Sequence, residues 1–209
     1  MTRPIRPVAP DRLATELASG IDGNAVGGAA VRVALDGPLC ADPHGLAAAM
    51  TGPLRVLGRP AVQVRAEYFW RDAALRLEYG RTDIHSLLHD WLDTAALERE
   101  LLDPLGPGGS GRYLPSLRDP TTNRATREPK RLADPGTVLI VSGELLLGYG
   151  LPFDWTIHLR LSPAARTRRT TAERAWTLPA FDEQDATVRP AETADVVVKL
   201  DDARHPAIG

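Results

Sequence analysis

A segment near the amino terminus combines an apolar strand, a tight turn and the start of a helix. Residues 29–35 are apolar and partly β-branched, Gly37 opens the turn, and an alanine- and leucine-rich helix follows Gly45. Proteins hold phosphate with this layout, because the free N–H groups at a helix N-terminus attract anions. The turn also has the length of the phosphate-binding pattern G-x-x-x-x-G-K-[ST].

The three side chains that carry the phosphate chemistry of this pattern are replaced. Asp42 stands at the second glycine, Pro43 at the lysine and His44 at the serine or threonine. Pro43 has no N–H to donate, and a carboxylate beside a phosphate repels it by about 1 to 4 kcal/mol at partly screened distances. The residues placed to meet a nucleotide are Gly37, Asp42, Pro43, His44 and Gly45, and their chemistry argues against ordinary, tight ATP binding.

Apolar runs predict the strands that position this turn. They cover residues 29–35, 61–65, 137–141, 155–161 and 194–200. The first two runs are separated by a helix, so they form a strand–helix–strand unit whose crossover should be right-handed. Strands that alternate with helices predict an α/β fold with a mostly parallel sheet.

Helical periodicity fills the gaps between the strands. Gly52 and Pro53 act as a stop signal for the helix after the turn, and Asp93 offers a fresh N-cap inside a longer helical run. Thr170 and Glu173 have the spacing of a capping box. The expected helices span residues 11–21, 45–50, 84–102 and 162–169. Residues 106–111 are glycine-rich but follow a helix and precede no lysine, so we interpret them as a flexible connector rather than as a phosphate loop.

Composition limits the class of protein. A chain of 209 residues can bury one medium core, and a formal net charge of −2 gives no support for a nucleic-acid partner. Cys40 is the single cysteine, which excludes an intrachain disulfide and fits a reducing cytoplasm. No apolar run approaches the roughly 20 residues that span a bilayer, and the first residues lack the apolar core of a signal peptide. We expect a cytoplasmic protein without a membrane partner. The sequence is compatible with a homo-oligomer.

These residues together resemble the uridine kinase and phosphoribulokinase branch of the P-loop kinases. The resemblance extends from about Val31 to Val198. Residues 91–113 are especially similar to actinobacterial uridine-kinase-like proteins, whereas the phosphate-binding loop differs from that of the family. It implies a P-loop NTPase-like (nucleoside-kinase) fold as a single domain over residues 1–209. It also implies an arginine-rich lid at about residues 162–178 and a substrate loop at about residues 106–135.

The resemblance assigns a role to the acid after the second strand. Such kinases carry Asp-x-Phe-Tyr there, with the Asp as general base on the acceptor hydroxyl, and this chain has Glu67-Tyr68-Phe69-Trp70. A carboxylate at the carboxyl end of a strand faces the ligand crevice, so Glu67 could act as the base. Tyr68 and Trp70 would form an aromatic wall for the substrate. The alternative is an exposed acid at the strand end.

Two further acidic positions have competing interpretations. Asp83 matches an Asp near the nucleoside in the family, or it is simply a helix N-cap. Asp119 and Arg124 match a substrate loop that would contact sugar hydroxyls, or Asp119 belongs to an Asp-Pro turn. Ser142 stands where the family has an acid after its third core strand, and this puts Mg²⁺ ligation in doubt. Because no second ligand is placed by spacing around a lone His, no metal site is predicted.

The lid of the family closes arginines over phosphates. Arg166 and Arg169 would stabilise a transferred phosphoryl group, and Arg168 and Arg174 lie beside them. The alternative is that these charges form a solvated helix face. His158 lies within an apolar strand and is interpreted as a packed core histidine.

The leading hypothesis is a uridine-kinase-like phosphotransferase that acts on a nucleoside or a similar hydroxylated small molecule. Glu67 would be the base, Arg166 and Arg169 would stabilise the transferred group, and ATP and Mg²⁺ would be doubtful cofactors. The alternative is a catalytically inactive pseudokinase that binds a ligand or a partner. A third hypothesis is a kinase fold reused for another reaction, with the substrate held around Tyr68, Trp70 and Trp91.

Overall fold

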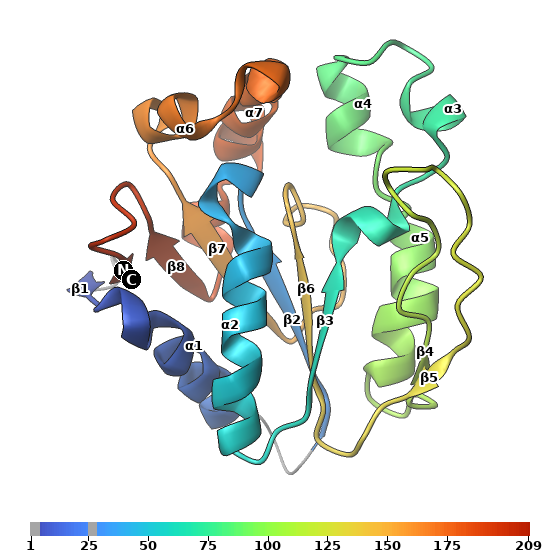
Figure 1. Ribbon diagram of the computed structural model, residues 1–209, viewed down its shortest axis with the longest axis vertical. Helices are drawn as coiled ribbons and strands as arrows, with labels where there is room; N and C mark the ends of the chain where they lie inside the picture. Colours follow the sequence, from blue (N-terminus) through green and yellow to red (C-terminus); the bar gives the residue numbers. More distant parts are fainter. Residues whose placement is uncertain (1–4, 25–28) are drawn as a thin grey trace.

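The computed structural model describes residues 5–24 and 29–209. Its centre is a seven-stranded sheet of order β1-β9-β8-β7-β2-β6-β3, shown in Figure 1. Strands β2, β3, β6, β7 and β8 pair in parallel, whereas β1 and β9 pair antiparallel at one edge. The strands span Arg6–Pro7 (β1), Val31–Asp36 (β2), Ala61–Arg65 (β3), Val138–Gly143 (β6), Trp155–Arg160 (β7), Val196–Lys199 (β8) and Ala207–Ile208 (β9). The predicted mostly parallel α/β sheet is confirmed.

Strands β2 and β6 are buried along their whole length, as their apolar sequences predict. Their side chains alternate between two cores. Val33 and Ile140 face one core together with Leu17 and Met50, while Leu139 and Val141 belong to the core on the other face. Helices α1 (Pro10–Asn24) and α2 (Pro43–Val56) pack against each other, on the same side of the sheet in Figure 1.

Helix α2 is longer than the sequence predicts. Its expected end near Gly52 is wrong, because the helix continues through Pro53 to Val56. Met50 and Leu54 are both fully buried against the sheet. We infer that burying Leu54 offsets the hydrogen bond that Pro53 cannot make.

The helical run expected over residues 84–102 is broken into pieces. It forms α4 (Ile84–His89), α5 (Thr94–Leu97) and a π-helical segment (Glu98–Leu102). The carboxylate of Asp93 accepts from the N–H of Ala96 at 3.0 Å, so the predicted N-cap is confirmed. The break has a tertiary cause: Trp70 and Leu92 form a β-bridge, and the N–H of Asp93 donates to the carbonyl of Phe69.

The segment after β7 departs from the predicted capping box. The short helix after Thr170 begins at Ala172 with Thr171 as its N-cap and without a side-chain capping bond. Thr170 instead donates its hydroxyl to the carbonyl of Arg166. The elements of this region are α6 (Pro163–Arg169), a 3₁₀ helix (Ala172–Thr177), α7 (Leu178–Thr187) and α8 (Pro190–Thr193).

The polar loop of residues 106–135 carries a two-stranded ribbon, β4 (Arg112–Tyr113) with β5 (Arg131–Leu132). Its glycine cluster, expected to be a flexible connector, is a hydrogen-bonded turn. The N–H of Gly111 donates to the carbonyl of Pro104 at 2.8 Å. A Cβ at Gly109 would lie 2.4 Å from the carbonyl oxygens of Asp103 and Pro104, so this turn requires glycine there.

Candidate ligand-binding site

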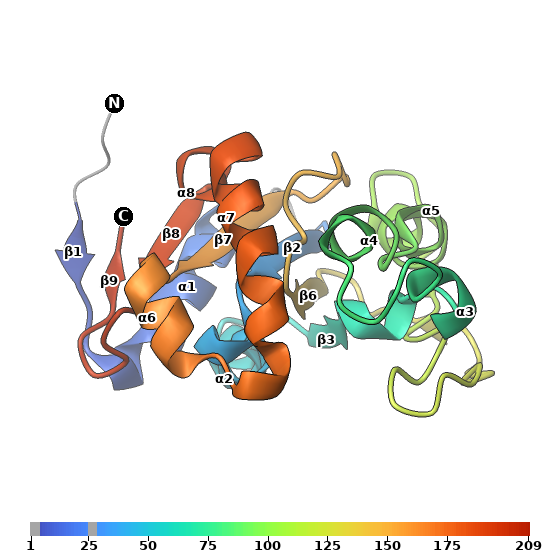
Figure 2. The ribbon, with the colours of Figure 1, turned by 90° about the horizontal axis from the view of Figure 1, so that it is seen from above.

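The carboxyl ends of the central strands bring the candidate site together. Because β2 pairs with both β6 and β7, Asp36 lies in register with Gly143 and His158, and Ser142 lies in register with Arg65 of β3. Open α/β sheets bind ligands in the crevice outside this edge. Figure 2 looks down on it, with α6 and α7 on one side and α3 (Ala73–Arg76) and α4 on the other.

The turn from β2 to α2 has the path of a phosphate-binding loop. Gly37 packs so closely on β7 that a Cβ there would lie 2.7 Å from the Cβ of Leu159. A short 3₁₀ turn (Leu39–Ala41) follows, and α2 begins at Pro43. Asp42 has φ 57°, the left-handed conformation that favours glycine, which agrees with the glycine of the pattern at this position. The predicted strand–turn–helix connection over Gly37 to His44 is confirmed.

The chain's own carboxylate occupies one amide donor of this turn. Asp42 accepts a hydrogen bond from the N–H of Gly45 at 2.9 Å and thereby caps α2. In the phosphate-binding pattern, N–H groups at this helix start point to the anion. Asp42 therefore both repels a phosphate and uses one of the donors that would hold it.

His44 links three elements at the sheet edge. Its Nδ1 lies 2.9 Å from the Oγ of Ser142, and its Nε2 lies 3.1 Å from Oε1 of Glu67. The sequence singled out these three residues separately, and the structure brings them together. Glu67 is only 7% exposed, so it is not an exposed acid. Its second carboxylate oxygen, Oε2, is buried without a hydrogen-bond partner among the described residues.

Glu144 and Arg174 form an ion pair that sequence analysis missed. The side chain of Glu144 is 4% exposed and contacts the guanidinium of Arg174. Arg174 comes from residues 162–178, the segment expected to be a lid and called the lid segment below. Burial raises the pKa of Glu144; the nearby charge of Glu67 adds to this rise, and Arg174 opposes it. The available signal was the position of Glu144, two residues beyond Ser142 at the end of a core strand.

This buried acid gives a pH dependence that a variant can isolate. A carboxyl whose pKa is raised in the folded protein binds its proton more tightly there than in the unfolded chain. Stability is therefore lost as pH rises from the unfolded pKa near 4.5 through the folded pKa. We expect Glu144→Gln to become progressively more stable relative to the parent over this window in urea titrations. A constant difference across the window would contradict the assignment.

The lid arginines divide into two groups. Arg166 is 4% exposed, pairs with Asp182 and with Asp185 at 3.0 Å, and lies over the ring of Phe181. It therefore ties α6 to α7. Arg169 donates to the carbonyl of Asp201 at 2.9 Å, and with Arg174 it lines a cavity of about 190 Å³ beside Leu39 and Glu144. Arg169 and Arg174, rather than Arg166, therefore lie beside the turn from β2 to α2.

Aromatic rings pack together on the side of the site where, by the family resemblance, a phosphate-accepting substrate would bind. Trp70 and Trp91 meet edge to face with centroids 4.9 Å apart, and Trp176 of the lid segment lies 5.8 Å from Trp91. The cavity lined by Trp70, Trp91, Glu144 and Tyr149 has about 20 Å³, enough for one water molecule. A larger ligand would have to displace side chains here.

The other predicted contact residues make local bonds. Asp83 accepts from the N–H of Ser86 at 2.7 Å and caps α4. Asp119 accepts from the N–H groups of Thr121 and Thr122, which is the predicted Asp-Pro turn. Arg124 is exposed. Both alternatives drawn from the sequence, the cap and the turn, are thus present in the structure.

A second buried pair lies beneath the site. The carboxylate of Asp36 is fully buried, accepts from the N–H of Leu146 at 2.7 Å and lies 2.7 Å from Nδ1 of His158. His158 is buried, as predicted, but its polar partner was not foreseen. This pair fastens β2 and β7 to the turn that follows β6.

Across the described ranges, no cluster of three or more His, Cys, Asp or Glu side chains could hold a metal ion. The residues at the loop do not fit Mg²⁺–ATP: Pro43 and His44 stand where the pattern has its lysine and its serine or threonine, and Asp42 adds a carboxylate. No helix in the described part of the chain is long and apolar enough to cross a membrane.

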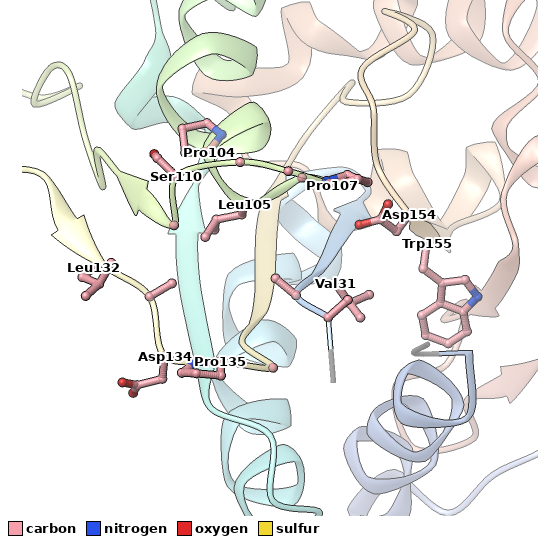
Figure 3. A pocket seen from close by; sticks show the side chains of 18 of the residues that line it. Val31, Pro104, Leu105, Pro107, Ser110, Leu132, Asp134, Pro135, Asp154 and Trp155 are labelled. Carbon is pink, nitrogen blue, oxygen red and sulfur yellow. The ribbon is translucent and has the colours of Figure 1, made fainter. Parts of the chain in front are cut away.

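A further cavity lies away from this edge. It has about 780 Å³ and is bounded by Val31, Leu105, Asp154, Trp155 and the glycine-rich turn, as Figure 3 shows. Val31 begins β2, so the cavity lies at the amino end of the strand. Asn24 and Ala29 belong to its wall and flank residues 25–28, which are outside the described residues.

No family model and no curated protein sequence matches the chain significantly. Solved structures do match it. A protein named as a possible uridine kinase from Bacillus stearothermophilus superposes with a TM-score of 0.71 at 18% identity, over 89% of this chain and 97% of that one. The chain has the P-loop kinase fold.

A second P-loop kinase-fold structure gives the same result. A protein named as a putative fructose transport system kinase from Silicibacter sp. TM1040 superposes with a TM-score of 0.63 at 21% identity, over 87% of this chain and 94% of that one. Both matches cover most of the chain, so the predicted fold class is confirmed. The fold hosts many chemistries, and function has to be argued from the site.

Proposed function

We propose that this protein is a cytoplasmic, kinase-fold module that binds a small hydroxylated molecule at the carboxyl edge of its sheet and does not use ATP–Mg²⁺. One observation supports the proposal: polar side chains at the turn from β2 to α2 are bonded to other groups of the chain itself. Asp42 and Glu144 are carboxylates beside the loop, and His44 links Glu67 to Ser142.

The electrostatics support this proposal. A P-loop site binds triphosphate because a lysine, a metal ion and amide donors neutralise its charge. In this chain the lysine is a proline, one amide is taken by Asp42, and Arg174 is already paired with Glu144. Adding a triphosphate would place it against two carboxylates.

A phosphotransferase that uses Glu67 as its base is the second candidate. The unpartnered Oε2 of Glu67 favours it, because a buried carboxylate oxygen without a donor can accept the proton of a bound hydroxyl. Arg169 would then face the transferred group.

Calorimetric titration with ATP–Mg²⁺ and a phosphoryl-transfer assay on a panel of nucleosides and sugars test the two candidates together. We expect no saturable heat with ATP–Mg²⁺ and no transfer. Micromolar ATP–Mg²⁺ binding would contradict the proposal. Turnover that is lost in Glu67→Gln would establish the second candidate instead.

A further inference from the structure

An arginine is buried beside the tryptophan pair without a carboxylate partner. Arg76, at the end of α3, is 6% exposed. Its guanidinium carbon lies 4.9 Å from the ring centroid of Trp70 and 4.8 Å from that of Trp91. The Nε–H donates to the carbonyl of Arg71 at 2.9 Å. Among the described residues no carboxylate lies within ion-pair distance of it, although buried arginines are normally paired.

One carboxylate, that of Asp72, acts on the charge of Arg76, and Arg118 competes for it. The nearest acid that acts on it, Asp72, already pairs with Arg118 at 3.0 Å and accepts from the N–H of Ala74 at 2.9 Å. Two guanidinium groups thus share one carboxylate. Burial lowers the pKa of Arg76, the charge of Arg118 lowers it further, and Asp72 only opposes these effects. Such a charge needs an anion close by.

Unused hydrogen-bond donors lie in the same place. The Nε1–H of Trp91 is buried and has no partner among the described residues, and the two terminal nitrogens of Arg76 make no hydrogen bond there either. Trp91 also lines the small cavity on the acceptor side. The carboxylate on this cavity, Glu144, pairs with Arg174 instead. A buried donor left without an acceptor is costly, so these donors favour a ligand that supplies one.

We propose that Arg76 binds an anionic group, a carboxylate or a phosphate monoester, on the ligand of this protein. This rests on the proposed small-molecule function and narrows the ligand to anionic compounds. The planar guanidinium presents two parallel N–H donors to either group. Trp70 and Trp91 would pack against the apolar part of the same ligand, and its hydroxyl end would point to Glu67.

The tryptophans report directly on this site. Wild-type protein is titrated with inorganic phosphate and, separately, with acetate at constant ionic strength, and the intrinsic fluorescence is followed. We expect a saturable change with at least one anion. The apparent affinity should be weaker by about tenfold or more in Arg76→Gln. Arg81→Gln, which removes an exposed charge further along the same stretch of chain, is the matched control and should titrate like the wild type.

A purely structural cation–π contact would give a different pattern. If neither anion produces a saturable change, or if Arg76→Gln and Arg81→Gln respond alike, the proposal is wrong. Arg76→Lys retains the charge but not the planar pair of donors, and it keeps the test available should Arg76→Gln fail to fold. Its anion affinity should be weaker than that of the wild type, and an affinity equal to the wild type's would contradict the proposal. The anion that saturates the signal at the lower concentration indicates whether the ligand carries a phosphate or a carboxylate. The titration contains no nucleotide, so its failure is distinct from failure of the ATP–Mg²⁺ prediction.

Discussion

Replacing Asp42, Pro43 and His44 together by Gly, Lys and Thr is expected to strengthen the binding of ATP–Mg²⁺ to this loop. The change removes a repelling carboxylate, frees the amide of Gly45, and supplies an ammonium and a hydroxyl for phosphate and metal. The backbone already follows the required path, and glycine suits the left-handed conformation of position 42. We expect a gain of about 100-fold or more in affinity, measured by calorimetry.

A matched triple variant isolates the charge. Asp42→Gly with Pro43→Met and His44→Thr has the same chain path and a similar side-chain size but no ammonium, so it should recover only a small part of the affinity. If the lysine-bearing variant folds and still shows no more affinity than the methionine-bearing one, the loop is not a latent phosphate site.

Asp36→Ala is expected to destabilise the protein by about 3 to 5 kcal/mol. The substitution leaves the buried N–H of Leu146 and the ring of His158 without their acceptor, and both lie in the dry interior of the sheet edge. Unfolding in urea, followed by tryptophan fluorescence, measures the loss.

The controls are Asp36→Asn and Thr51→Ala. The first keeps an acceptor of the same shape and should cost less than Asp36→Ala. The second removes a hydroxyl that bonds only to the carbonyl of Ala48 within exposed helix, and it should be nearly neutral. A loss below about 1 kcal/mol for Asp36→Ala would mean that the Asp36–His158 pair does not fasten the strands.

Much of the sheet could be predicted because its central strands are continuous apolar runs. The apolar runs around Val33, Ile140 and Ile157 are typical of parallel strands that are buried on both faces, and these residues are buried. The two-residue strands β1 and β9 carry no such pattern, and only pairing between the chain ends creates them. The end of α2 was missed for a related reason: the stop signal at Pro53 is local, whereas the burial of Leu54 is tertiary.

The site was predicted as a set of positions rather than as contacts. The resemblance placed Glu67, Ser142 and the turn at His44 near a ligand, but their mutual bonds depend on β6 lying between β2 and β3. The order of the strands in the sheet cannot be predicted from any one segment of the sequence. The pairing of Glu144 with Arg174 depends in the same way on where the lid segment folds back, and so does the pairing of Arg166 with Asp182 of α7.

Growing crystals with ATP and Mg²⁺ in excess tests the central claim most directly. The account predicts that the Asp42 cap, the His44 bridge and the Glu144–Arg174 pair stay in place, with no triphosphate density between Gly37 and Gly45. Ordered phosphates bonded to the amides of that turn, with these three contacts broken, would contradict it.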